Sequence, residues 1–296
     1  MPIIDHHQVL KGLTVQMAMR RQVIDLPQGA ELASAIRAMA KYKVNAVLIT
    51  GERHLPLGVV SKTDLMTAYY GGLPLEAPVA DIMVGPPQFC QSQDSLDAAL
   101  DQMRQHRIHR LYVRRGEDET VSGVLAFPDI VGMLYRYCRR CDRNLLQRQG
   151  KESEMNWADQ FIVREVMTPS VLSYYATDSL WEVMTGLAAY KFGAVPILNP
   201  GGVPSGVISK TDLALAYLHA VPPEQEAQSV MNAPVVTCNQ DDLLLEVIKR
   251  LIFSDLHRIF VYKDNPENLV GVLSLSDAAR FRSGSCRACL VSRIEI

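Results

Sequence analysis

The chain has 296 residues, of which 48% are hydrophobic and 21% are charged, so it carries enough apolar material for packed cores. Its formal net charge of −2 gives no general attraction to nucleic acid or to an anionic membrane. No apolar stretch approaches the roughly 18 residues of a membrane span, and the N-terminal residues do not resemble a secretion signal. Six cysteines in a chain of this kind indicate a reducing compartment, and we predict a cytoplasmic location.

The sequence repeats itself after 148 positions. The string GVVSKTDL at 58–65 returns as GVISKTDL at 206–213, and every cysteine has a counterpart at the same offset. Each half is itself double, because a weaker copy of the string begins 65 residues further on, at Gly123 and at Gly271. The sequence therefore predicts four related repeats of about 55–60 residues each.

Each repeat has the pattern of a β-α-β-β-α fold. A short segment with a methionine (Met19, Met83, Met167 or Met231) precedes a helix whose apolar residues recur at spacings of three and four. That spacing places them on one helical face, which we interpret as core rather than as ligand contacts. The four stripes are Leu32/Ala35/Ile36/Met39, Leu96/Ala99/Leu100/Met103, Leu180/Val183/Met184/Leu187 and Leu244/Val247/Ile248/Leu251.

An apolar strand, a polar turn and a second strand opening with the repeated glycine then predict a hairpin, which runs directly into a second helix. The small sheet of one repeat leaves an apolar face uncovered, so we expect consecutive repeats to pair. The predicted fold class is α+β, with two such pairs associating about a pseudo-two-fold axis into a disc. The predicted boundaries are a first pair at 1–141 (repeats 14–70 and 79–138), a linker at 142–162, and a second pair at 163–296 (repeats 163–220 and 227–283) with a short tail.

The string Ser61-Lys62-Thr63-Asp64 lies where a strand is predicted to meet a helix, and it has two interpretations. In the first, Ser61 caps the helix and Asp64 accepts from the cap N–H, which stabilises the helix by about 1 kcal/mol without any ligand. In the second, the helix N-terminus attracts a phosphate while the carboxylate accepts hydrogen bonds from a ribose. The residues alone leave both interpretations open.

Four repeats with glycine, two apolar residues and then S/T-x-x-D resemble cystathionine-β-synthase (CBS) domains, and two pairs of them resemble two Bateman modules. The resemblance covers about residues 14–138 and 162–283. It extends to the γ subunits of the AMP-activated protein kinase, whose even-numbered repeats carry an I-H-R-L or V-H-R string. This chain has Ile108-His109-Arg110-Leu111 and Leu256-His257-Arg258-Ile259 at those places.

The resemblance implies a set of ligand-binding residues. By analogy with the family, Asp64, Asp212 and Asp277 would hold ribose hydroxyls, and the pairs His109-Arg110 and His257-Arg258 would face phosphates. The alternative for each His-Arg pair is a solvated rim beside a buried strand. The hydroxyls that would assist ribose or phosphate are those of Ser61, Thr63, Ser209, Thr211, Ser274 and Ser276.

The second repeat departs from this pattern. Ala126-Phe127-Pro128-Asp129 keeps the aspartate but has no hydroxyl, and it places a proline in the first helical turn, where proline is tolerated. Without the hydroxyl, one hydrogen bond to a ligand is missing, which weakens ligand binding by about 1 kcal/mol, and the Phe127 side chain adds bulk at the site. We expect this site to be the weakest of the four or empty.

The cysteines form a separate pattern. Cys138-x-x-Cys141 and Cys286-x-x-Cys289 follow the last helix of each pair and would supply four thiolates for zinc or an iron–sulfur cluster if they met. A redox disulfide, or a duplicated feature with no function, are the alternatives. Cys90 and Cys238 lie in apolar strand-like segments, and we expect them to be ordinary buried residues.

The repeats leave no residues for a catalytic domain, and no nucleophile elbow, phosphate-binding loop or metalloprotease string is present. The sequence therefore predicts a non-enzymatic regulatory sensor that binds AMP, ADP or ATP in clefts between paired repeats and signals to an unidentified effector protein. Arginines favour such phosphorylated ligands over the cationic S-adenosylmethionine. The alternative is a metal- or redox-responsive protein with vestigial nucleotide sites. Either a monomeric disc or a homodimer fits the repeat number.

Overall fold

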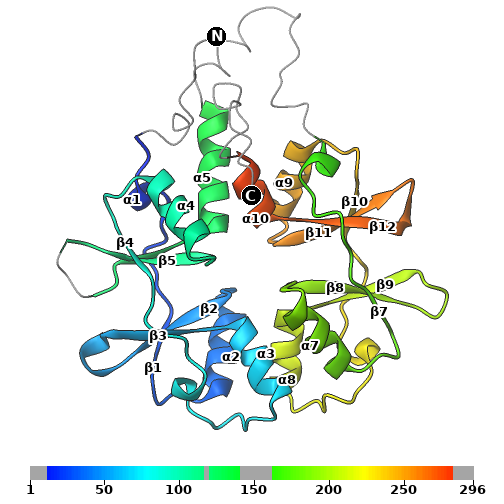
Figure 1. The fold of residues 1–296 in the computed structure, drawn as a ribbon, viewed down its shortest axis with the longest axis horizontal. Helices are drawn as coiled ribbons and strands as arrows, with labels where there is room; N and C mark the ends of the chain where they lie inside the picture. The colour runs from blue at the N-terminus through cyan, green and yellow to red at the C-terminus, as the bar shows by residue number, and fades with distance from the viewer. Residues whose placement is uncertain (1–11, 117–119, 141–161, 283–296) are drawn as a thin grey trace, which may run out of the picture. The chain divides into compact units, whose positions relative to one another are not determined.

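The structure is a computed structural model, and it describes residues 12–116, 120–140 and 162–282 (Figure 1). Four copies of one arrangement follow one another along the chain, each with a three-stranded sheet and two main helices. Each copy is a mixed α and β repeat, as the sequence predicts. None of the described helices has the length and apolar composition needed to cross a membrane.

The bounds of the elements follow the predicted order in every repeat. The first repeat contains α1 (Val15–Ala18), β1 (Asp25–Pro27), α2 (Leu32–Lys41), β2 (Ala46–Thr50), η1 (Glu52–His54), β3 (Pro56–Ser61) and α3 (Lys62–Tyr70). The second contains η2 (Val79–Asp81), β4 (Phe89–Gln91), α4 (Leu96–Gln105), β5 (Arg110–Arg114), β6 (Gly123–Ala126) and α5 (Phe127–Arg140). The third contains η4 (Val163–Glu165), β7 (Tyr174–Tyr175), α7 (Leu180–Ala189), β8 (Ala194–Leu198), β9 (Pro204–Ser209) and α8 (Lys210–Leu218). The fourth contains η5 (Ala227–Ser229), β10 (Thr237–Asn239), α9 (Leu244–Phe253), β11 (Arg258–Lys263), β12 (Asn265–Ser274) and α10 (Leu275–Arg282).

Every sheet has the same topology. The first strand pairs parallel with the second, and the second pairs antiparallel with the third, which confirms the predicted hairpins. Because the third strand ends where the second helix begins, each repeat has a strand-to-helix junction. We use the word junction for residues 61–64, 126–129, 209–212 and 274–277.

The apolar stripes of the first helices are buried in all four repeats, so their interpretation as core residues is confirmed. In α2, for example, Leu32 and Ala35 have no exposed surface and Ile36 and Met39 only 1%. The helical spacing places each stripe on one face of its helix. The apolar strands lie against that face, because a helix and a small sheet bury more apolar surface together than either does alone.

Packing divides the chain into two compact units, and neither coincides with one half of the sequence. One unit contains residues 23–87 and 171–236, and so holds most of the first and third repeats. The other contains the described residues within 1–22, 88–170 and 237–296, and so holds most of the second and fourth. Each unit has its own hydrophobic core. The pairing of consecutive repeats into modules stays a prediction.

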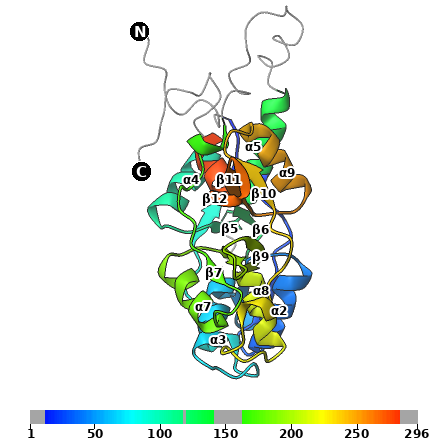
Figure 2. The same cartoon turned by 90° about the vertical axis from the view of Figure 1, so that its right-hand side faces the viewer.

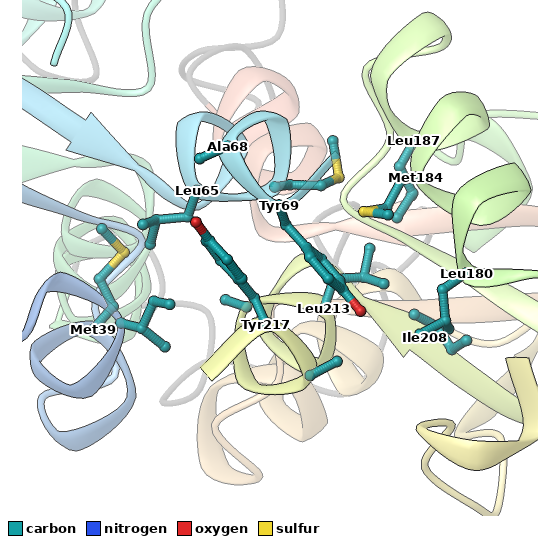
Figure 3. Close-up of a cluster of buried hydrophobic side chains, with 14 of the residues drawn as sticks. Met39, Leu65, Ala68, Tyr69, Leu180, Met184, Leu187, Ile208, Leu213 and Tyr217 are labelled. Carbon is teal, nitrogen blue, oxygen red and sulfur yellow. The ribbon is translucent and has the colours of Figure 1, made fainter. Parts of the chain in front are cut away.

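The unit of the first and third repeats has a nearly symmetric helix interface. Helices α3 and α8 lie side by side in both views (Figures 1 and 2). Tyr69 and Tyr217 stack between them, as Figure 3 shows, and their ring centroids are 5.0 Å apart. Each phenol donates to a carbonyl beyond the other helix, Tyr69 to Val221 and Tyr217 to Leu73. These polar atoms are therefore satisfied inside an apolar contact, as buried phenols usually are.

The segments with the methionines are exchanged between consecutive repeats. The segment before the first repeat pairs with the third strand of the second repeat, through the bridge Arg20–Val124. The segment before the second repeat pairs with the third strand of the first, through the bridge Val84–Val59. The other half of the chain repeats this exchange with Thr168–Val272 and Asn232–Val207. We call residues 14–20, 78–84, 162–168 and 226–232 the lead-in segments.

Candidate functional site

Three of the four junctions contain the capping interactions of the first interpretation. The Ser61 backbone N–H and hydroxyl both donate to Oδ2 of Asp64, each at 2.7 Å. The Ser61 oxygen in turn accepts from the backbone N–H of Thr63 and Asp64. The same aspartate oxygen is used at Ser209–Asp212 and at Ser274–Asp277. Since each serine proton is donated within the cap, the serine oxygens contact a ligand as donors only if the cap rearranges.

The cap occupies only one oxygen of each carboxylate. At Asp64 and at Asp277, no hydrogen bond to Oδ1 exists among the described residues. An ionised carboxylate has about four acceptor positions, so an unused oxygen can still accept from a ribose diol. Capping and ribose binding are therefore compatible at these two junctions.

The fourth junction brings an arginine beside its carboxylate. Arg258 begins β11 and pairs across the hairpin with Ser274, the residue that caps α10. Burial lowers the pKa of Arg258 to about 10, and the negative charge of Asp277 opposes this shift. Among the described residues, the guanidinium has no hydrogen bond or ion pair within 4.0 Å. A desolvated cation at a helix N-terminus favours an anionic ligand.

The equivalent arginine of the second repeat is already engaged. Burial lowers the pKa of Arg110, while its hydrogen bond to Tyr112 and the charge of Asp129 act in the opposite direction. His109 is exposed, and its ring and that of Phe127 form a T-shaped contact with centroids 5.7 Å apart. His257 lies at the fourth junction, where its backbone carbonyl accepts from the N–H of Leu275. Phosphate contacts of these residues stay a prediction.

The lysines and threonines of the two SKTD strings contact one another. Lys62 donates to the hydroxyl of Thr211 at 2.8 Å, and Lys210 donates to the hydroxyl of Thr63 at 2.9 Å. These reciprocal bonds join α3 to α8 within one compact unit. They give the threonine hydroxyls a structural partner, and ribose or phosphate contacts by Thr63 and Thr211 stay a prediction. Ser276, at the corresponding place in the fourth repeat, is half-buried.

One detail of the second junction differs from the sequence-based expectation. Phe127 does not add bulk to the junction surface, because it is only 3% exposed and packs into the core of its unit. Leu275 occupies the equivalent position in the fourth repeat and is also buried. The position directly after the cap is thus apolar and inward in the even repeats. In the odd repeats it is a lysine that reaches the neighbouring helix.

The structure describes only some of the cysteines for which predictions were made. Cys90 on β4 and Cys238 on β10 are buried free thiols, as expected. Burial raises the pKa of each to about 12. The backbone of Cys138 lies in α5, but its side chain and the residues Cys141, Cys286 and Cys289 lie outside the described part of the structure. The zinc or iron–sulfur hypothesis therefore stays a prediction.

A sequence profile of the CBS domain matches residues 15–71, 79–136, 163–219 and 227–284, which together make up most of the chain. The chain belongs to the CBS-domain family. Its four CBS domains correspond to the four repeats, and their fold is the three-stranded sheet with two helices described above.

Relatives with curated sequences match parts of the chain. An uncharacterized protein of Methanopyrus kandleri is 26% identical over 117 residues, which is 39% of this chain and 59% of that protein. The γ-3 subunit of the 5′-AMP-activated protein kinase of Bos taurus is 25% identical over 198 residues, 62% of this chain and 37% of that subunit. The match thus spans less than two thirds of the length of these relatives.

Solved structures share the fold over nearly the whole chain. A protein of Methanocaldococcus jannaschii, described as a candidate archaeal homologue of γ-AMPK, matches with a TM-score of 0.74 at 13% identity. The match covers 91% of this chain and 99% of that one. A conserved protein of Pyrococcus horikoshii matches with a TM-score of 0.58 at 15% identity. At these identities the likeness concerns the fold alone.

Sequence reasoning missed the role of the lead-in segments in these CBS repeats. The repeated glycine of each third strand lies against a methionine and the backbone after it: a Cβ on Gly58 would meet Met83 Sδ at 2.9 Å and the Val84 carbonyl at 3.1 Å. Only glycine leaves room for this approach. In the sequence, the glycine and the methionine both recur after 148 positions, and this common repetition was the available signal for their contact.

Proposed function

We propose that this CBS protein is a non-catalytic sensor of adenine nucleotides, and that AMP, ADP or ATP bound at the junctions changes its interaction with an effector protein. The observation that carries the proposal is the fourth junction, where the cap leaves one oxygen of Asp277 unused and the charge of Asp277 acts on the desolvated Arg258. A carboxylate for the ribose and a cation for the phosphates are the two chemical requirements of a nucleotide site.

Two further observations support the same function. The N-terminus of α10 begins at this junction, so its backbone N–H groups add positive potential there. The similarity to a γ subunit of the 5′-AMP-activated protein kinase supports a regulatory role in a complex, rather than catalysis by this chain. A nucleotide that signals must bind two conformations with different affinity, so we expect binding to alter packing beyond the junction.

The test is calorimetric titration of the full chain and of Asp277→Asn with ATP, AMP and adenosine. Asparagine keeps a carbonyl oxygen for the cap but replaces the unused carboxylate oxygen by an amide donor. We expect Asp277→Asn to weaken binding of all three ligands roughly tenfold or more, because each contains the ribose diol.

The matched control is Asp129→Asn. Asp129 holds the same place in the second repeat, but its Oδ1 is paired with Arg20 Nε at 2.8 Å. We expect this variant to lose stability without losing nucleotide affinity. Binding that is absent in the wild-type chain, or unchanged in Asp277→Asn, would contradict the proposed function.

A further inference from the structure

One position beside each junction differs between the four repeats. It is the residue directly after the methionine of a lead-in segment. Its backbone is fixed identically each time, because it exchanges two hydrogen bonds of 2.8–3.0 Å with the third strand of the junction it faces. The four pairs are Arg20 with Val124, Val84 with Val59, Thr168 with Val272, and Asn232 with Val207.

The side chain at this position determines what happens to the second carboxylate oxygen. In the second repeat, Arg20 Nε lies 2.8 Å from Asp129 Oδ1, and the Asp129 side chain is only 10% exposed. In the third repeat, the amide of Asn232 donates to Asp212 Oδ1 at 2.7 Å. Both donors take the oxygen that the helix cap leaves unused.

The two remaining junctions have no such bond among the described residues. Val84 faces the junction of Asp64, and Thr168 faces that of Asp277; no hydrogen bond from either side chain to its aspartate exists among the described residues. Val84 cannot donate, and 62% of it is exposed to solvent, which is unusual for a large apolar residue. Oδ1 of Asp64 is therefore left without an intramolecular donor among the described residues.

We propose that the residues Arg20, Val84, Thr168 and Asn232 decide which of the four CBS junctions accept a ribose. This inference rests on the proposed function and adds the order of occupancy. The junctions of Asp64 and Asp277 bind most tightly. The junction of Asp212 binds more weakly, because a diol must displace a neutral amide. The junction of Asp129 stays closed, because displacing Arg20 would break a charge-assisted bond at a largely buried carboxylate.

The physical basis is competition for one oxygen. A ribose diol and an intramolecular donor need the same lone pairs of Oδ1, and the intramolecular donor is held by two backbone hydrogen bonds at no cost in association entropy. A guanidinium donor competes better than an amide, because hydrogen bonds between ionised partners are roughly twice as strong as neutral ones. Valine does not compete at all.

The experiment transfers the donors between junctions in a chain that already carries Asp277→Asn, so that the Asp64 junction is the tightest remaining site. In this parent, Val84→Arg should weaken ADP binding by roughly tenfold to a hundredfold in calorimetry, the usual effect of losing hydrogen bonds to a charged group. Val84→Leu is the matched control, since it adds bulk without a donor and should bind ADP like the parent.

The reverse exchange tests the third repeat. Asn232→Val removes the amide from Asp212, and in the parent that also carries Asp64→Asn it should tighten ADP binding at the remaining junction by roughly tenfold. Because Asn232 and Val84 are both exposed, these substitutions leave the cores unchanged, and circular dichroism with thermal unfolding checks the fold of each variant.

The outcomes separate this inference from the proposed function. If Asp64→Asn weakens the residual ADP binding but Val84→Arg does not, the junctions bind nucleotide and the inference is wrong. If Val84→Leu weakens binding as much as Val84→Arg, bulk rather than donation controls access, and the inference is also wrong. If the wild-type chain binds no ADP, the proposed function itself fails.

Discussion

The desolvated Arg258 makes a quantitative prediction about stability. Folding lowers its pKa from 12.5 to about 10, chiefly through burial, so the cation is less stable in the folded chain than in the unfolded one. For a base with a lowered pKa this cost is fully present below about pH 10, and therefore at neutral pH. The shift corresponds to about 3 kcal/mol, and partial exposure of the side chain reduces it to about 1–3 kcal/mol.

Replacing Arg258 by methionine removes the charge and keeps an apolar side chain of similar length. We expect Arg258→Met to raise the free energy of unfolding by about 1–3 kcal/mol, measured by urea denaturation without nucleotide. The same variant should bind ATP and AMP more weakly than the wild type and should bind adenosine almost equally, measured by calorimetry. A residue that lowers the stability of the fold but strengthens phosphate binding is one retained for binding rather than for folding.

The matched control is Arg110→Met in the second repeat. Arg110 has the hydrogen bond to Tyr112 and the attraction of Asp129, so its removal leaves polar groups behind. We expect no gain in stability and a smaller loss of ATP affinity than Arg258→Met shows. If Arg258→Met instead destabilised the chain, the desolvation argument would be refuted. If it weakened adenosine and ATP binding equally, the phosphate role would be refuted.

Two further predictions concern groups whose pKa is raised by burial. Cys90 and Cys238, with a pKa of about 12, should resist alkylation by iodoacetamide at pH 8 in the folded chain and react after unfolding; peptide mass mapping of modified thiols at these positions in folded protein would contradict this. Burial and the charge of Glu224 raise the pKa of Tyr69 to about 12, so the unfolded phenol ionises first and stability should fall as pH rises above about 10. Tyr69→Phe removes the bond to the Val221 carbonyl, should cost about 1 kcal/mol at pH 7, and should make this alkaline loss shallower in urea denaturation series.

The fold was predictable because its signals are local and periodic. The helix stripes such as Leu32/Ala35/Ile36/Met39 recur at helical spacing, and the glycine-led strands lie one short turn after an apolar strand. These patterns need no knowledge of distant residues, since the periods of 3.6 and 2 determine which face is apolar. The packing of first with third and second with fourth repeats was not predictable, because any of the four apolar faces could cover any other.

The candidate site was only half predictable for the same reason. The helix cap formed by Ser61 and Asp64 depends on a spacing of three residues and follows from the sequence. The bond between Lys62 and Thr211 links residues 149 positions apart, and the pairing of Arg20 with Asp129 also joins distant segments. Sequence reasoning therefore found no partner for Lys62 and gave Arg20 no role. In the structure, both have intramolecular partners.

The two SKTD strings show why a motif alone does not define a binding site. Asp64 and Asp212 lie in identical strings, cap identical helix starts and use the same oxygen to do so. They differ in a residue of the lead-in segment that faces them: Val84 leaves Asp64 Oδ1 unused, whereas Asn232 donates to Asp212 Oδ1 at 2.7 Å. Repeats that are equal by motif are thus unequal by chemistry. A chain with graded junctions can respond over a wider range of nucleotide concentration than one with four equal sites, because sites of different affinity fill one after another.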